Sequence, residues 1–245
     1  EPDEIVYLWP GEPPGGIPEG LKEKVVERDN PFGLPDRAAH DVTAPSLSVF
    51  HPAHPDGSAI LIIPGGGYKW VVIDKEGYEG AVRFSGEGAT VYVLRYRLPH
   101  QNWQAGPQAP LQDAQRAVRV IRSREGQDGI DPDRLLVMGF SAGGHLAGLL
   151  ETGSGQVTYA PVDAADDFSA RPDATVLMYP VVTMRPPFAH AGSRLNQIGG
   201  SPTSELEAEW SIESRAASGQ PPIFILHAAD DKAVPVENAI MAYEA

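Results

Sequence analysis

Residues 139–143 (GFSAG) are the segment whose residue types and spacing point most directly to chemistry. They match the G-x-S-x-G pattern. An apolar run, 134–138, precedes them and predicts a strand, and 142–150 predicts a helix. A turn this sharp strains the serine backbone and leaves no room for side chains at the two flanking positions, which must be glycine. It also places the serine hydroxyl at the N-terminus of a helix, where the helix dipole favours negative charge. The pattern indicates that Ser141 is a nucleophile for acyl transfer.

A second loop, Pro64-Gly65-Gly66-Gly67-Tyr68, follows the apolar run 59–63. Three glycines let the backbone approach a ligand closely and turn its N–H groups inward. We expect the N–H groups of Gly66 and Gly67, with that of Ala142, to stabilise the oxyanion of a tetrahedral intermediate. A phosphate-binding loop is the alternative, but neither G-x-x-x-x-G-K-[ST] nor G-x-G-x-x-G occurs here.

Residues 227–235 (HAADDKAVP) follow the last predicted strand, 223–226. In hydrolases of the G-x-S-x-G type the chain order is serine, acid, histidine. An acid at this position could orient an imidazole. Asp230 and Asp231 both remain candidates on position alone.

The elements that must position these residues alternate between strand and helix from residue 59 onward. Further strands are predicted at 90–94 and 175–179, and an amphipathic helix at 111–124 that ends in the stretch 126–129. Helices are also predicted at 78–84 and, beginning at residue 237, near the end of the chain. This alternation predicts an α/β fold with a mostly parallel sheet and helices on both faces.

Composition narrows the function classes. Of 245 residues, 42% are apolar and 21% charged, which suits one soluble domain with a large core. The net charge of −14 argues against nucleic acid and anionic membranes as partners. With no cysteine, disulfides and thiolate metal sites are excluded. No apolar run approaches the roughly 20 residues that span a bilayer.

The domain organisation expected from these patterns has two parts. Residues 1–35 hold many of the 24 prolines and predict an extended Pro/Gly-rich arm. Residues 36–245 form the α/β domain, with an inserted lid-like segment at about 181–220, where the strand–helix rhythm breaks. The chain begins with Glu1, and with the arm this favours a secreted or periplasmic protein after leader removal, a cytoplasmic one being the alternative.

Taken together, four segments resemble the acetyl-xylan-esterase-like and BD-FAE-like group of α/β-hydrolases: 64–68, 139–145 (GFSAGGH), 189–194 (AHAGSR) and 227–235. The resemblance runs from about residue 40 to 245. It implies the α/β-hydrolase fold and a serine carboxylesterase that removes short acyl groups, often acetyl on plant polysaccharide, through an acyl-enzyme. It also implies no metal or organic cofactor, and it favours Asp231 over Asp230 as the acid.

The histidine of that family lies in a loop after one more helix and strand, whereas the seven histidines here all precede Asp231. A C-terminal strand and helix, with the catalytic histidine, are therefore expected to be missing from this chain. His145 and His227 are expected to be structural. His190, in the inserted segment, is expected to contact substrate rather than to act as the base.

Aromatic residues near the expected site are Tyr68, Trp70, Tyr96 and Trp103. Aromatic side chains in α/β proteins are usually core, but Tyr68 and Trp70 lie in or beside the glycine loop and are predicted to bind substrate. Two other functions stay open. A serine exopeptidase shares the fold but would need an acidic clamp and usually an extra domain. A non-catalytic binding protein on this scaffold would need neither the nucleophile turn nor the glycine loop.

Overall fold

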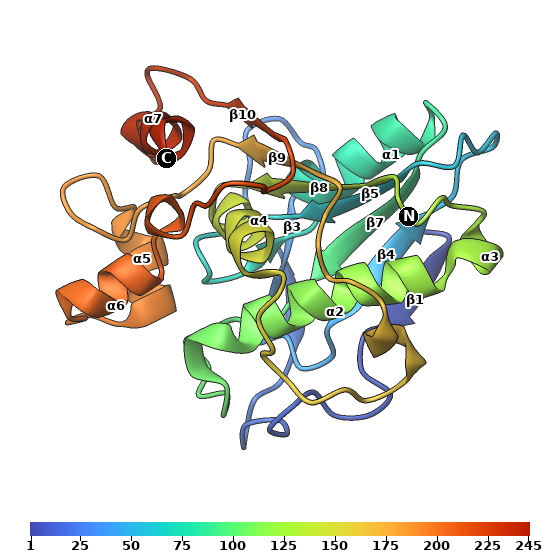
Figure 1. Ribbon diagram of the computed structural model, residues 1–245, viewed down its shortest axis with the longest axis horizontal. Helices are drawn as coiled ribbons and strands as arrows, with labels where there is room; N and C mark the ends of the chain where they lie inside the picture. The colour runs from blue at the N-terminus through green and yellow to red at the C-terminus, as the bar shows by residue number, and fades with distance from the viewer.

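A seven-stranded sheet lies at the centre of the computed structural model, which describes residues 1–245 (Figure 1). In spatial order the strands are β1 (Glu4–Tyr7), β4 (Ser46–Phe50), β7 (Thr90–Arg95), β5 (Ala59–Ile63), β8 (Leu135–Phe140), β9 (Ala174–Met178) and β10 (Ile223–Leu226). The last five in this order are parallel to one another, and β4 runs antiparallel to both of its neighbours.

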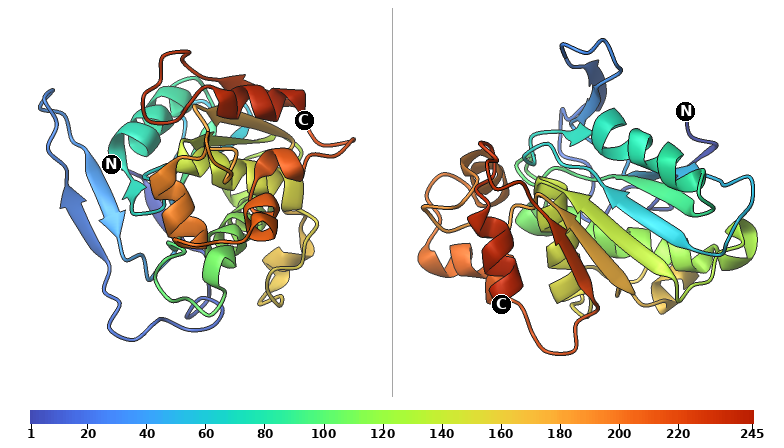
Figure 2. Two further views of the ribbon diagram at one scale, coloured as in Figure 1. Left: turned by 90° about the vertical axis from the view of Figure 1, so that its left-hand side faces the viewer. Right: turned by 90° about the horizontal axis from the view of Figure 1, so that it is seen from above.

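Helices cover both faces of this sheet (Figure 2). One face carries α1 and the other carries α2 and α4, while α5 and α6 lie beyond the carboxyl ends of the strands (Figure 1). The helices are α1 (Glu79–Ser85), α2 (Ala109–Ser123), α3 (Glu125–Asp128), α4 (Ala142–Gly153), α5 (Ala191–Ile198), α6 (Ser204–Glu209) and α7 (Glu237–Glu244). Shorter turns are a π-type turn at Asp74–Tyr78 and 3-10 turns at Gly106–Gln108, Ala164–Asp167 and Ile212–Ser214.

Strand β5 shows why the apolar runs form the middle of the sheet. All five of its residues are buried, and they alternate between two cores. Leu61 and Ile63 belong to the larger core under α2 and α4, whereas Ile60 and Ile62 belong to the smaller core under α1. A strand that is covered on both faces reads as an unbroken apolar run, and this confirms the sequence-based prediction.

The N-terminal residues differ from the expected arm. Strand β1 is the edge of the central sheet, paired with β4, and β2 (Lys24–Glu27) and β3 (Arg37–His40) form a second sheet with β6 (Val71–Val72). The β2–β3 hairpin projects from the body of the domain (Figure 2). Strands β1 and β2 are held by backbone pairing and contain no buried residue, so the residue pattern carries little signal for them.

The predicted strands and helices from residue 59 onward are present within a few residues of their expected bounds, whereas the buried strand β4 and the helices α5 and α6 were not predicted, and the stretch 126–129 differs. That stretch was expected only to end a helix, but its first three residues belong to α3, which ends at Gly129 in the left-handed region (φ 64°). The segment 181–220 contains α5 and α6. None of the helices is long and apolar enough to cross a membrane.

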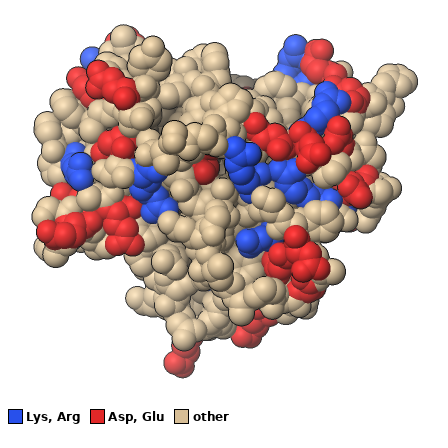
Figure 3. All heavy atoms as spheres, viewed as in Figure 1, with Lys and Arg blue, Asp and Glu red and all other residues tan.

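Charges of both signs are interspersed on one face of the molecule (Figure 3). On the face seen in Figure 3, Lys and Arg side chains lie in small groups among Asp and Glu side chains. This face therefore carries no broad basic patch of the kind that binds a phosphate backbone. Ion pairs also occur elsewhere in the chain: Arg116 contacts both Asp163 and Asp166, and Arg194 contacts Glu207.

Candidate active site

Ser141 lies in a sharp turn between β8 and α4. Its backbone has φ 53° and ψ −117°, a conformation that L-residues rarely adopt. A Cβ on Gly143 would lie 2.1 Å from the carbonyl oxygen of Ile63, and one on Gly139 would lie 2.3 Å from that of Gly143. Both contacts are with backbone, which cannot move aside. The expected nucleophile turn is therefore present, and only glycine fits at its two flanks.

The backbone of Ser141 is fixed while its hydroxyl is free. The amide donates to the carbonyl of Met178 at 3.0 Å, and the carbonyl accepts from the amides of His145 and Val181. The side chain is partly exposed and makes no hydrogen bond to the N-terminal turn of α4. A serine held in this way can present its oxygen to a substrate.

The oxyanion loop, residues 64–68, is held at several points. Tyr96 donates its hydroxyl to the carbonyl of Pro64 at 2.8 Å, and the side-chain amide of Asn196 donates to the carbonyl of Gly67 at 2.8 Å. Gly66 (φ 126°) and Gly67 (φ 64°) have backbone angles that favour glycine. The loop is thus a fixed structure rather than a flexible linker.

The three backbone amides predicted to form the oxyanion hole belong to Gly66 and Gly67 of the loop and to Ala142 of α4. The amides of Gly66 and Gly67 donate to no backbone or side-chain acceptor in the chain. Ala142 is the first residue of α4, where no preceding turn offers a helical acceptor. The amide of Gly65, by contrast, donates to the carboxylate of Glu76 at 2.9 Å. The oxyanion assignment to Gly66, Gly67 and Ala142 stays a prediction.

The hydroxyl of Tyr68 joins the oxyanion loop to the nucleophile helix. It lies 2.8 Å from Nδ1 of His145, whose Nε2 lies 2.7 Å from the carbonyl oxygen of Trp210. A carbonyl only accepts, so Nε2 carries the proton and Nδ1 accepts from the tyrosine. Burial lowers the pKa of His145 to about 4, which keeps the ring neutral. His145 is structural, as expected.

This contact corrects the prediction that Tyr68 binds substrate. The ring of Tyr68 has no exposed surface, and its hydroxyl is already engaged. A left-handed backbone (φ 57°) turns the side chain inward from the loop, toward α4. Tyr68 therefore anchors the loop from beneath. Tyr96 and Trp103 are buried as well, in agreement with a core role.

Trp70 and His190 are the predicted substrate contacts that remain open to a ligand. Trp70 is partly exposed, with its ring 5.2 Å from that of His40 and Nζ of Lys69 4.5 Å above it.

His190 lies beside the glycine loop. Its Nδ1 accepts from Ser193, and the His190 ring lies against Gly67, with Cε1 3.8 Å from the position that a Cβ on Gly67 would take. Partial burial lowers the pKa of His190. Its Nε2 makes no hydrogen bond in the chain and is a donor in the neutral ring.

Asp231 lies in the loop after β10, and its carboxylate is partly exposed. Oδ1 accepts from the amides of Ala233 and Val234 at 2.8 and 3.0 Å, and Oδ2 lies 3.5 Å from Nε2 of His227. Burial alone would raise the pKa of Asp231, but these two amides outweigh it, so the pKa lies below its ordinary value. Asp230 is exposed. Asp231 is thus a fixed, ionised group, while its role as the acid stays a prediction.

The histidines near these groups are bonded elsewhere. His227 lies 2.9 Å from the carbonyl oxygen of Val234 through Nε2, and His145 has both ring nitrogens engaged. His190 keeps Nε2 free but is held by Ser193 through Nδ1. In this structure Ser141 has a fixed backbone and a free hydroxyl without an imidazole bonded to it.

The sequence-based reasoning missed three residues that hold this site: Glu76, Tyr179 and Asn196. Glu76 accepts from Gly65, Tyr179 donates its hydroxyl to Glu76 at 3.2 Å, and Asn196 donates to Gly67. They come from three separate segments. In the sequence, Glu76 precedes a predicted helix, Tyr179 ends a predicted strand and Asn196 lies in the inserted segment, and none of these positions singles out a side chain.

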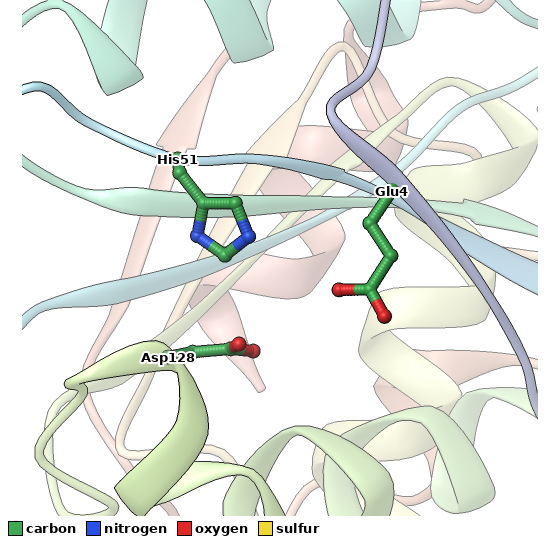
Figure 4. A group of neighbouring side chains, drawn as sticks. All are labelled: Glu4, His51 and Asp128. Atoms are coloured by element: carbon green, nitrogen blue, oxygen red, sulfur yellow. The ribbon is translucent and has the colours of Figure 1, made fainter.

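One cluster has the residue types of a metal site. The side chains of Glu4, His51 and Asp128 have ligand atoms within 4.8 Å of one another (Figure 4). Arg124 contacts Glu4 at 2.6 Å and Asp128 at 2.7 Å, so a cation already balances both carboxylates. Asp128 precedes β8, which places the cluster at the amino ends of the strands, away from Ser141. It is a structural ion-pair network.

Two proteins of known function are similar to this chain in sequence. The chain is 37% identical over 182 residues to endo-1,4-beta-xylanase B of Butyrivibrio fibrisolvens, covering 74% of this chain and 28% of that protein. It is 33% identical over 200 residues to an acetylxylan esterase of Xylanibacter ruminicola, covering 80% of this chain and 38% of that protein. The chain thus spans well under half the length of these two relatives.

Solved structures and a family model place the fold. An acetyl ester-xyloside bifunctional hydrolase from Caldicellulosiruptor lactoaceticus superposes with a TM-score of 0.78 at 32% identity, over 98% of this chain and 80% of that one. Esterase 2 of Thermogutta terrifontis, at 23% identity and a TM-score of 0.65 over 92% of this chain and 79% of that one, shares the fold. The BD-FAE family model matches residues 47–245, a range that contains the nucleophile turn, the oxyanion loop and Asp231. The chain therefore belongs to the BD-FAE family and has the α/β-hydrolase fold.

Proposed function

We propose that the chain carries the catalytic centre of a serine esterase that removes short acyl groups, acetyl foremost, from carbohydrate such as acetylated xylan. The observation that carries the proposal is Ser141, strained and unbonded at its hydroxyl, in a turn packed against a fixed glycine loop. An acetylxylan esterase and an acetyl ester-xyloside hydrolase among the similar proteins support the substrate class.

The reaction begins when Oγ of Ser141 attacks the ester carbonyl carbon. The carbonyl π electrons move onto oxygen, and the amides of Gly66, Gly67 and Ala142 stabilise the oxyanion. The serine proton passes to an imidazole that Asp231 orients, and from there to the leaving alcohol as the C–O bond breaks. Water then attacks the acyl-enzyme by the same route and releases the acid and free Ser141.

Trp70 borders Gly66 and His190 borders Gly67, and we assign both side chains to the alcohol part of the substrate. The partly exposed indole of Trp70 offers apolar surface to a sugar ring, and Nε2 of His190 offers a donor to a sugar oxygen. Neither is needed to form the oxyanion. Their replacement by alanine should therefore raise KM for acetylated xylan more than it changes the hydrolysis of p-nitrophenyl acetate.

A series of p-nitrophenyl esters tests the acyl specificity. We expect kcat/KM to be highest for acetate and to fall steeply beyond about four acyl carbons, since each methylene in a confined site is worth about 1–3 kcal/mol of discrimination. Ser141→Ala should abolish turnover of every ester in the series. Activity that rises toward octanoate would instead indicate a lipase-like groove.

A non-catalytic binding protein on the same scaffold is the competing function, because no imidazole is bonded to Ser141. Against it stands the strained serine, a conformation of the kind that costs about 1–3 kcal/mol and that a binding surface does not need. Turnover separates the two functions. If hydrolysis occurs and His190→Ala alone abolishes it, His190 is the base rather than a substrate contact.

A further inference from the structure

The carboxylate of Glu76 joins two segments at the active site that are far apart in the chain. Oε2 accepts from the amide of Gly65 at 2.9 Å, and Oε1 accepts from the hydroxyl of Tyr179 at 3.2 Å. Gly65 opens the glycine run of the oxyanion loop, and Tyr179 follows the last residue of β9 with an unusual φ of 37°. One side chain thus holds the oxyanion loop and the end of a neighbouring strand together.

Glu76 also lies beside the nucleophile. A Cβ on Gly65 would be 2.8 Å from Oε2 of Glu76 and 3.0 Å from Cβ of Ser141, so both side chains border the same small space. Gly65 must therefore be glycine, because any side chain there would displace Glu76 or the nucleophile turn. The carbonyl of Gly65 is fixed as well, since it accepts from the amide of Val72 at 3.0 Å.

The turn that carries Glu76 is itself anchored. The neighbouring carboxylate of Asp74 accepts from the backbone amide and the guanidinium of Arg37. Gly77 lets the turn approach β7, since a Cβ there would lie 2.8 Å from Cγ1 of Val93. A side chain on such a turn has a fixed direction. Burial raises the pKa of Glu76 despite the hydrogen bonds from Gly65 and Tyr179.

We propose that Glu76 is the positioning residue of the oxyanion hole: by accepting the amide of Gly65 it sets the loop so that the amides of Gly66 and Gly67 are left to the substrate. The inference rests on the proposed esterase function for its kinetic consequence, but not for its structural one. The proposed role depends on a side chain long enough for its oxygen to accept from the amide of Gly65. It does not depend on the charge of the carboxylate.

Two conservative variants separate reach from charge. Glu76→Gln keeps the length and lets the amide oxygen accept from Gly65 while the amide nitrogen donates to Tyr179. Glu76→Asp keeps the charge but is one methylene too short for Gly65. Glu79→Asp is the matched control, because Glu79 is exposed and follows the same turn.

The first measurement is amide hydrogen exchange at Gly65, which needs no catalytic turnover. We expect exchange at least 10-fold faster in Glu76→Asp than in the wild type, and exchange within about 3-fold of the wild type in Glu76→Gln and Glu79→Asp. The second is steady-state hydrolysis of p-nitrophenyl acetate. Glu76→Asp should lose about 10²-fold in kcat with KM nearly unchanged, comparable to the loss of one oxyanion donor, and Glu76→Gln should stay within about 3-fold.

The outcomes are distinguishable. If Glu76→Gln is as impaired as Glu76→Asp, the charge of the carboxylate is what matters. If amide exchange and kcat are unchanged in Glu76→Asp, the contact with Gly65 does not position the loop. Either result overturns the proposal. Hydrolysis that survives Ser141→Ala would defeat the proposed esterase function instead, while the exchange result for Gly65 would still stand.

Discussion

The nucleophile region and the acid region of this protein are built in different ways. We call β5, β8, α4 and the loop 64–68 the nucleophile region, after the proposed nucleophile Ser141, and residues 223–245, with β10 and α7, the acid region, after the proposed acid Asp231. Every residue of β5 is buried, whereas Phe224 and Leu226 of β10 are 59% and 47% exposed. Of α7, only Asn238 is buried.

Different forces therefore fix the two regions. Backbone contacts that exclude any side chain hold the nucleophile turn, as at Gly139 and Gly143. Hydrogen bonds hold the acid region: Asp231 accepts from its own loop, and Asn238 of α7 accepts from the distant backbone amides of Val182 and Thr183. The nucleophile region should be intolerant of substitution, while the acid region should tolerate changes that do not touch its chemistry.

Gly143→Ala should have the largest effect on stability. Its methyl group would meet the carbonyl oxygens of Ile63 and Pro64 at 2.1 and 2.5 Å, so the strand, the loop and the helix would all have to move. We expect a loss of more than about 4 kcal/mol in the free energy of unfolding, measured by urea denaturation. Gly155→Ala, where no atom lies within 4 Å, is the control and should change it by less than about 0.5 kcal/mol. Equal effects at the two glycines would contradict the steric account.

Asp231→Asn should lower the rate of ester hydrolysis without lowering the stability of the acid region. The asparagine oxygen still accepts from Ala233 and Val234, so the free energy of unfolding should change little. The wrong imidazole orientation should lower kcat by about 10²–10⁴-fold. Asp230→Asn should cost much less. If Asp230→Asn is the more damaging substitution in esterase assays, Asp230 is the acid.

A matched pair of leucines sharpens the comparison of the two regions. Leu61→Ala in β5 removes a fully buried side chain and should cost about 2–5 kcal/mol. Leu226→Ala in β10 removes one that is 47% exposed and should cost less than about 1 kcal/mol. Chemical denaturation of both variants measures the difference. Similar costs would mean that β10 is packed as tightly as β5 in solution.

The middle of the sheet could be predicted from the sequence because burial on both faces produces apolar runs, as in β5 and β7. The strands β1 and β2 could not be predicted, because they contain no buried residue and so show no clear alternation of apolar and polar residues. The nucleophile turn was predictable because steric exclusion fixes the residue types at 139 and 143. The role of Glu76 could not be predicted from the sequence. An acidic residue in a short helical turn is expected to face solvent, and only tertiary packing directs its side chain toward Gly65.

His145 gives a smaller, pH-dependent effect within the nucleophile region. Its pKa is lowered to about 4 in the fold, against 6.5 for the ordinary group, because burial disfavours the charged ring. The unfolded chain therefore binds more protons between these values, and stability falls as the pH drops from about 6.5 to 4. The shift corresponds to about 3 kcal/mol. In His145→Gln this part of the pH dependence of unfolding should disappear; an unchanged slope would mean that His145 titrates normally.

The most direct measurement of the central claim is covalent labelling of the serine. An organophosphonate that reacts with nucleophilic serines should add once to the protein, and peptide mapping by mass spectrometry should find the adduct on Ser141. Ser141→Ala should abolish the adduct, while the exposed Ser204 stays unmodified in both proteins. Labelling that persists in Ser141→Ala, or that maps to another residue, would contradict the assignment of Ser141 as the nucleophile.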